Sequence, residues 1–217
     1  MPTRTSSATT EPRGKTLREL ERAVAACTAC GLHRDRTVPI AGEGPADARL
    51  MIVGSVPRRH EDLQGDPYAG GTGNVLLHAL DQAGLSRDEV RLTMVVRCRP
   101  EGDRAPTDEE VRTCTRHLHD EVALVGPEVI VALGAFPTAV LLGRRVPIER
   151  VAGYRLDVLQ GVTLVPTYHP ADAVRGVPQA AGSLQRDLAV AKAVLDGRLP
   201  TGAQALAEFK AREAASS

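Results

Sequence analysis

The stretch Leu50–Gly73 reads LMIVGSVPRRHEDLQGDPYAGGTG. Its first four residues are apolar, which predicts a short buried parallel strand that ends at Gly54. A long loop follows and leads to a helical pattern that begins near Asn74. Open α/β sheets bind their ligands in loops at the carboxyl ends of strands. This loop is therefore a candidate binding site, and its charged and aromatic residues are Arg58, Arg59, His60, Glu61, Asp62 and Tyr68.

The composition is that of a globular protein. With 217 residues, 42% of them hydrophobic, the chain can bury a core, and we expect one domain. The formal net charge is zero, so any surface that binds nucleic acid must be a local patch. The sequence contains no apolar run of about 18 residues and no signal-peptide pattern, so we expect a cytoplasmic protein without a membrane span. We also expect a monomer.

Residues 1–14 are rich in Thr, Ser, Pro and Arg, and we expect a disordered tail. Residues 15–197 are expected to form the single domain, and residues 198–217 a C-terminal tail with a loose helix from Ala203. Besides the first strand, we predict strands over Val90–Val96 and Val129–Leu133, and a hairpin of Tyr154–Val158 and Val162–Pro166 turned at Gln160-Gly161. Capping patterns and periodicity predict helices from Thr16 to Ala26, Asn74 to Ala83, Thr107 to before Gly126, Pro137 to Leu142 and Ser183 to Leu195, with one turn at Ser86. Because strands and helices alternate, the predicted fold is α/β, a three-layer α/β/α sandwich with a mostly parallel central sheet.

The four cysteines form a spaced set, Cys27-x2-Cys30, Cys98 and Cys114. In a cytoplasmic chain such cysteines are typical of metal ligands rather than disulfides. Four thiolates suit either tetrahedral zinc or a [4Fe–4S] cluster. Zinc ribbons usually have two short pairs and this chain has one, which makes zinc the less natural choice. The alternative is four unrelated buried thiols, since free cysteine is often buried.

A second strand-end loop carries the sequence Thr167-Tyr168-His169-Pro170. It follows the second arm of the predicted hairpin, so His169 is expected at the carboxyl edge of the sheet. A histidine there is either a structural residue or a group that handles protons or hydrogen bonds at neutral pH.

These motifs, in this order, resemble the family 4 uracil-DNA glycosylases, the iron–sulfur branch of the uracil-DNA glycosylase superfamily, from about Leu17 to Leu195. The resemblance is carried by Cys27-x2-Cys30, Arg97-Cys98-Arg99-Pro100, Cys114, Leu133-Gly134-Ala135, Gly54-Ser55-Val56-Pro57 with its continuation through Tyr68 and Gly70, and His169-Pro170 with Arg175. It implies a structural [4Fe–4S] cluster on the four cysteines and DNA as the substrate.

The resemblance also assigns roles in a pocket for a base that has been flipped out of DNA. Tyr68 would stack on the base, where the family has Phe, and His169 would donate a hydrogen bond to the departing base. Arg175 would contact phosphates. The remaining residues assigned by resemblance are Gly54 and Val56 in the base pocket, and Arg58 and Arg59 as further contacts to the DNA backbone.

Some departures from the family fall in the pocket. Ser55 stands where the family has an acid that helps to place the attacking water, so Glu61 or Asp62 would have to substitute by turning inward. His60 lies where the family 5 branch carries a histidine, which suggests another water-positioning group or a nucleophile. Met94 replaces an Asn whose amide reads the edge of uracil, and methionine cannot make those hydrogen bonds.

The leading hypothesis is a DNA glycosylase that removes uracil or another base, a bulkier or alkylated one suiting Met94. The main alternative is a DNA- or lesion-binding protein of the same fold without turnover. A zinc-bound nucleotide-binding protein is disfavoured because no GxxxxGK[ST] or GxGxxG motif follows a strand.

Overall fold

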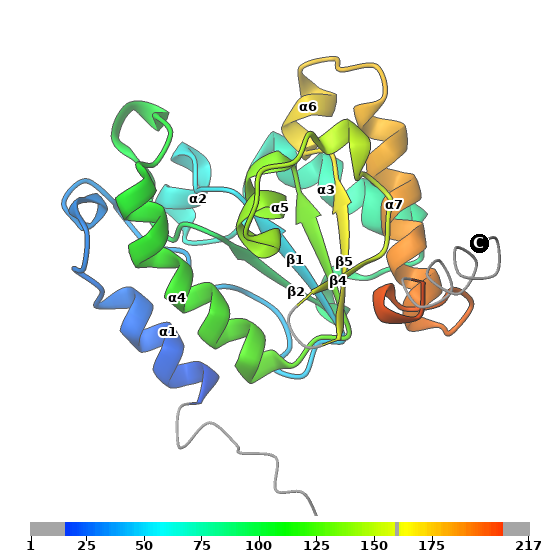
Figure 1. Cartoon of the computed structure of the whole chain (residues 1–217). Coiled ribbons are helices and arrows are strands. Elements are labelled where there is room, and N and C mark those ends of the chain that lie inside the picture. Colours follow the sequence, from blue (N-terminus) through cyan, green and yellow to red (C-terminus); the bar gives the residue numbers. More distant parts are fainter. Residues whose placement is uncertain (1–15, 159–160, 206–217) are drawn as a thin grey trace, which may run out of the picture.

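The computed structural model describes residues 16–158 and 161–205. Its centre is one five-stranded sheet in the order β2-β1-β3-β5-β4 (Figure 1). The strands are β1 (Leu50–Gly54), β2 (Val90–Met94), β3 (Val129–Leu133), β4 (Leu156–Val158) and β5 (Val162–Thr167). All neighbouring pairs are parallel except β4 with β5, which confirms the mostly parallel sheet.

Helices cover both faces of the sheet. Figure 1 shows α1 (Leu17–Ala25) and α4 (Asp108–Val125) on one side, and α3 (Gly71–Gln82) and α7 (Ala180–Leu195) on the other. Alternate residues of the strands pack into two hydrophobic cores, one on each face of the sheet. Leu50 and Ile52 pack with α3 and α7, while Met51 packs with α4 and with α5 (Ala135–Leu142). Strands β1, β2 and β3 are buried throughout, as expected for parallel strands covered on both faces. The three-layer sandwich is therefore confirmed.

The predicted capping boxes form the expected helix starts. The Thr16 and Thr107 side chains accept from the backbone N–H three residues on, and the acids at those positions return the bond. Gly126 ends α4 in the left-handed conformation, with φ 62°.

Several element boundaries differ from the sequence-based predictions. The loop after β1 contains an unpredicted helix, α2 (Arg59–Gln64), and His169 is followed by another, α6 (Pro170–Val174). Strand β2 ends at Met94, before the predicted Val96; beyond it, Val95 still donates to Gly54 at the end of β1, and Val96 donates to Ser55 in the loop that follows. The bounds above also place the starts of α3, α5 and α7 two or three residues earlier than predicted, and that of β4 two residues later.

The predicted tail over residues 1–14 and Gln160 of the hairpin turn lie outside the described residues. In the predicted C-terminal tail, residues 202–205 are helical, and residues 206–217 lie outside the described part. Within the described ranges, no helix is both long and apolar enough to cross a membrane.

Candidate active site

A cleft of about 520 Å³ opens at the carboxyl edge of the sheet. Each of the four parallel strands contributes to it: Ser55 follows β1, Met94 ends β2, Gly134 follows β3 and His169 follows β5. Because parallel strands end at the same edge, loops far apart in sequence meet there. Most of the predicted site residues line this cleft: Ser55, Val56, Arg58, Tyr68, Met94, His169 and Arg175.

Tyr68 lines the cleft and is closely packed against Gly54 and Gly73. It is 3% exposed and its φ of 68° is left-handed, which is unusual for a bulky residue. A Cβ at Gly54 would overlap its hydroxyl, and a Cβ at Gly73 would overlap its carbonyl oxygen. Burial raises the pKa of this hydroxyl, and the charge of Glu61 raises it further. Gly54 is therefore needed to make room for the Tyr68 ring.

Met94 lies next to Gly54 in the same core cluster as Tyr68. It is 3% exposed and ends β2, where its side chain forms part of the cleft wall. The thioether presents an apolar surface with a weak acceptor sulfur. The base-binding role assigned to Met94 thus has an apolar group at the expected place.

His169 is the N-cap residue of α6, which fixes both its position and its tautomer. Its Nδ1 accepts a hydrogen bond from the backbone N–H of Ala171 at 3.0 Å. The backbone N–H of His169 donates to the Asp172 carboxylate at 3.2 Å. A backbone N–H can only donate, so Nδ1 carries no proton and Nε2 carries it. Burial lowers the pKa of the imidazole to about 4, Asp172 opposes this shift, and Arg175 and Arg58 add to it. His169 is thus a neutral hydrogen-bond donor at physiological pH.

Two of the three predicted DNA-contacting arginines lie at the cleft. Arg175 is paired with Asp172, and its side chain is 68% exposed. Arg58 donates to the carbonyl of Asp103 and is also exposed. Arg59 is exposed on α2, outside the residues that line the cleft.

His60 is not brought to the cleft. It lies on the exposed side of α2 and its ring packs against Gly70. His60 is thus not among the residues that line the cleft with His169 and Ser55, so its placement gives no support to a role as a nucleophile or water-positioning group.

Of the two acids that could substitute for the missing one by turning inward, Glu61 lines the cleft and is 4% exposed, whereas Asp62 is not among the residues that line it. The structure also adds two residues that sequence reasoning did not assign. Val174 is 61% exposed at the end of α6, next to Arg175. Asp172 caps α6 from the third position, and the spacing His-x-x-Asp was a usable signal for it, since a capping box pairs an N-cap residue with an acid three residues on.

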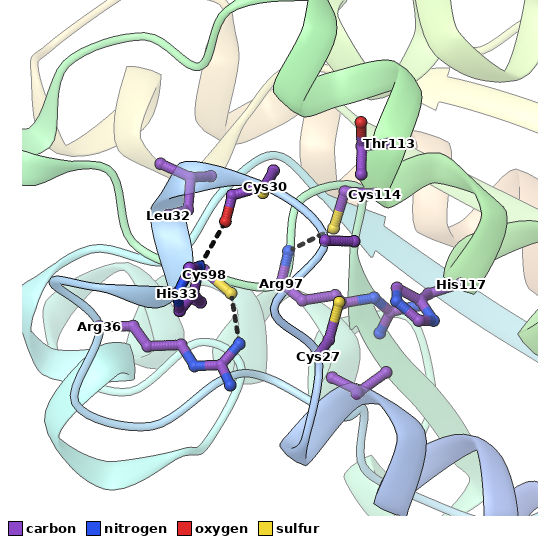
Figure 2. Close-up of a pocket in the computed structure, with 12 residues that line it drawn as sticks. Cys27, Cys30, Leu32, His33, Arg36, Arg97, Cys98, Thr113, Cys114 and His117 are labelled. Carbon is purple, nitrogen blue, oxygen red and sulfur yellow. Dashed lines mark hydrogen bonds between the residues drawn. The ribbon is translucent and has the colours of Figure 1, made fainter.

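The four cysteines meet in a second pocket, on the α1 and α4 side of the sheet. Cys27 and Cys30 follow α1, Cys98 follows β2, and Cys114 belongs to α4. Figure 2 shows all four among the residues that line this pocket. Among the described residues, no three Cys, His, Asp or Glu side chains are arranged to hold a single metal ion.

Nitrogen donors surround these sulfurs. Arg36 Nη1 lies 3.1 Å from Cys98 Sγ, and the backbone N–H of Arg97 donates to Cys114 Sγ at 3.3 Å (Figure 2). Arg116 Nη2 lies 3.7 Å from Cys27 Sγ. Burial raises the pKa of Cys114 to about 11, so at neutral pH this residue is a thiol unless a positively charged group binds it.

A buried charge network adjoins the cysteine pocket. Glu121, fully buried in α4, accepts from Arg91 at 2.7 Å, from Arg97 at 2.5 Å and from Thr93 at 2.7 Å. Two arginines therefore share one fully buried carboxylate, with Glu21 at 3.3 Å from Arg91 as a partly exposed second anion. Arg97 also lines the cysteine pocket, so the network brings positive charge to it.

Comparison with known proteins agrees with this arrangement. The family model of the uracil DNA glycosylase superfamily matches residues 41–189. The type-4 uracil-DNA glycosylase of Thermotoga maritima is 40% identical over 150 residues, which cover 69% of this chain and 78% of the relative. That of Pyrobaculum aerophilum is 36% identical over 183 residues, covering 80% and 92%. The type-5 uracil-DNA glycosylase of Mycobacterium leprae is 34% identical over 157 residues, covering 61% and 67%.

The matched segment contains all four parallel strands and every residue of the cleft. Family model, identity and fold agree. The chain belongs to the uracil DNA glycosylase superfamily.

Proposed function

We propose that this protein is a DNA glycosylase that hydrolyses the N-glycosidic bond of uracil, or of another damaged base, in DNA. The observation that carries the proposal is the neutral His169, whose protonated Nε2 is fixed by the bond from Ala171 to Nδ1. The type-4 relatives named above support the same reaction.

The chemistry requires a donor of this kind. When the C1′–N bond breaks, the departing base takes the electron pair and becomes an anion. A preorganised donor in a cleft shielded from water stabilises such a charge far better than water does. Burial keeps the pKa of His169 at about 4, so the imidazole retains its single Nε2 proton and donates a hydrogen bond throughout the neutral pH range.

Tyr68 and Met94 define the proposed base pocket. The Tyr68 ring would stack on a flipped base, and Met94 would contact it with an apolar surface. Apolar contact discriminates weakly between bases, whereas hydrogen bonds to a base edge discriminate strongly. We therefore expect weaker selection for uracil than an amide at position 94 would give.

Exposed groups beside the cleft suit a DNA backbone. Arg58 and Arg175 would neutralise phosphates, while the exposed Val174 would serve as an apolar wedge against the base stack. Such contacts make binding fall with rising salt concentration.

We further propose that the four cysteines hold a [4Fe–4S] cluster. The donor set fits, because four thiols share one pocket and nitrogen donors at three of them, with the charge of Arg97, would offset the negative charge of a thiolate-bound cluster. When bound, the cluster would tie α1 and the segment after it to α4 and the loop after β2. Visible absorption with iron and sulfide quantification of anaerobically purified protein tests this, and stoichiometric zinc without sulfide would contradict it.

A base-release assay tests the proposed reaction. Oligonucleotides that each contain one uracil, hypoxanthine, xanthine or alkylated base are incubated with cluster-loaded protein, with His169→Ala as the control. Release above the control identifies the base. DNA binding without release from any substrate would instead favour the binding protein, the alternative that Ser55 and Met94 raise.

A further inference from the structure

Three carboxylates line the cleft, and two of them are neutralised by neighbouring groups. Asp103 accepts from Arg99 at 2.6 Å, and this bond holds the pKa of its carboxyl below the usual value. Asp172 is occupied on both oxygens, one by Arg175 and the other by the backbone N–H of His169. Neither is suited to take a proton from a reacting group.

Glu61 differs from both. It is 4% exposed, and its Oε2 accepts a 3.0 Å bond from the backbone N–H of Arg58. Within the described ranges it forms no ion pair. It lines the cleft together with Tyr68, and its charge adds to the rise that burial causes in the pKa of the Tyr68 hydroxyl.

A buried carboxyl group without a cationic partner is costly to the fold, so such groups are often functional. The adjacent Asp62 provides a contrast. It is just as buried, but its Oδ1 accepts from the backbone N–H of Thr37 at 2.9 Å, and it lies outside the cleft. Asp62 thus has a structural task, and Glu61 has a place in the cleft.

We propose that Glu61 is the general base that activates the attacking water, in a chain whose residue 55 is a serine. The inference rests on the proposed glycosylase reaction. The water oxygen forms a bond to C1′ and gives one proton to the Glu61 carboxylate. The C1′–N bond breaks, and its electron pair leaves with the base, whose negative charge accepts the Nε2–H bond of His169. Ser55 lines the same cleft.

The test compares Glu61→Gln with Asp62→Asn. An amide oxygen at position 61 can still accept the Arg58 N–H, so α2 keeps its cap, while proton acceptance is lost. On the DNA substrate that the wild-type protein cleaves, single-turnover base release by Glu61→Gln is expected to fall by about 10²–10⁴-fold with unchanged DNA affinity. Asp62→Asn, checked for folding by thermal unfolding, is expected to stay within about threefold of wild type.

A rescue separates a catalytic role from a structural one. Adding Ser55→Glu to Glu61→Gln returns a carboxylate to the cleft from another lining position, and is expected to restore release at least about tenfold. Glu61→Gln that releases base within threefold of the wild-type rate would overturn the inference while leaving the proposed function intact. Glu61→Gln could instead release base slowly, gain nothing from Ser55→Glu, and lose as much thermal stability as Asp62→Asn. This result would assign Glu61 a structural role. If the wild-type protein releases no base from any substrate, the proposed function itself is contradicted.

Discussion

The backbone N–H of Ala171 donates to Nδ1 of His169 at 3.0 Å, and this bond fixes the tautomer of the imidazole, with the proton on Nε2. It comes from the first turn of α6, a helix that His169 itself caps. Helix capping and positioning of a neutral donor are thus achieved by one side chain. The pKa of about 4 follows mainly from burial, with Arg175 and Arg58 adding to it.

This lowered pKa predicts a loss of stability in mild acid. Between pH 6.5 and about 4 the unfolded chain binds a proton at residue 169 that the folded protein refuses, so the free energy of unfolding falls as pH falls through this window. At pH 5 the loss due to His169 is expected to be about 2 kcal/mol relative to pH 7.5. Urea unfolding of wild type and His169→Asn at both pH values measures it, since Asn can also cap α6. Identical pH dependence in the two proteins would refute the buried neutral histidine.

Met94→Asn is predicted to sharpen the choice of base. An amide at the cleft wall supplies a donor and an acceptor, and the ratio of uracil release to release of an alkylated base should rise about tenfold, the equivalent of one added hydrogen bond. Burial of the amide should lower the free energy of unfolding by about 1–3 kcal/mol. Met94→Leu is the control and should leave the ratio unchanged; an unaltered ratio in Met94→Asn would remove residue 94 from base recognition.

Gly54 and Tyr68 should be energetically coupled. A methyl group at residue 54 would overlap the Tyr68 hydroxyl, so Gly54→Ala is expected to destabilise the fold by about 1–3 kcal/mol. Tyr68→Phe should be nearly neutral, because the buried hydroxyl has no hydrogen-bond partner in the part of the chain that the structure describes. In a double-mutant cycle, Tyr68→Phe should relieve part of the Gly54→Ala loss. Gly182→Ala, on α7 with free space around it, is the control that should not destabilise. Additive effects of the two changes would contradict the overlap.

Glu121→Gln is predicted to be strongly destabilising. It leaves the buried guanidinium groups of Arg91 and Arg97 without their shared carboxylate, which should lower the free energy of unfolding by about 3–5 kcal/mol. Glu109→Gln on the exposed face of α4 is the matched control, with an expected change within about 0.5 kcal/mol. Chemical denaturation of both variants gives the comparison, and equal stabilities would show that the network contributes nothing.

The sheet follows from the sequence because its strands are short apolar runs buried on both faces. Leu50–Gly54 and Val129–Leu133 could be assigned on that pattern alone. Helix α2 was missed because Arg58 stands at its N-cap, and the stabilising bond comes from Glu61 reaching back to the Arg58 N–H. A polar stretch between Pro57 and Gly65 gives no apolar periodicity from which such a helix can be read.

The site was predictable to the extent that it depends on strand ends. Ser55, Met94 and His169 each end or follow a parallel strand, and strands β1, β2, β3 and β5 bring them to one edge. The orientation of α2 was not predictable, and it decides that Glu61 faces the cleft whereas His60 packs against Gly70. The resemblance predicted which motifs form the site, and the geometry of the helix determines which residues of those motifs line the cleft.

Single-turnover base release by wild-type protein and by His169→Ala, with DNA binding measured in parallel, tests the account most directly. We expect release by the wild type and a rate at least about a hundredfold lower in His169→Ala, with DNA affinity retained, because the variant loses the donor to the departing base. Equal release rates in the two proteins, or DNA binding without release by either, would contradict it.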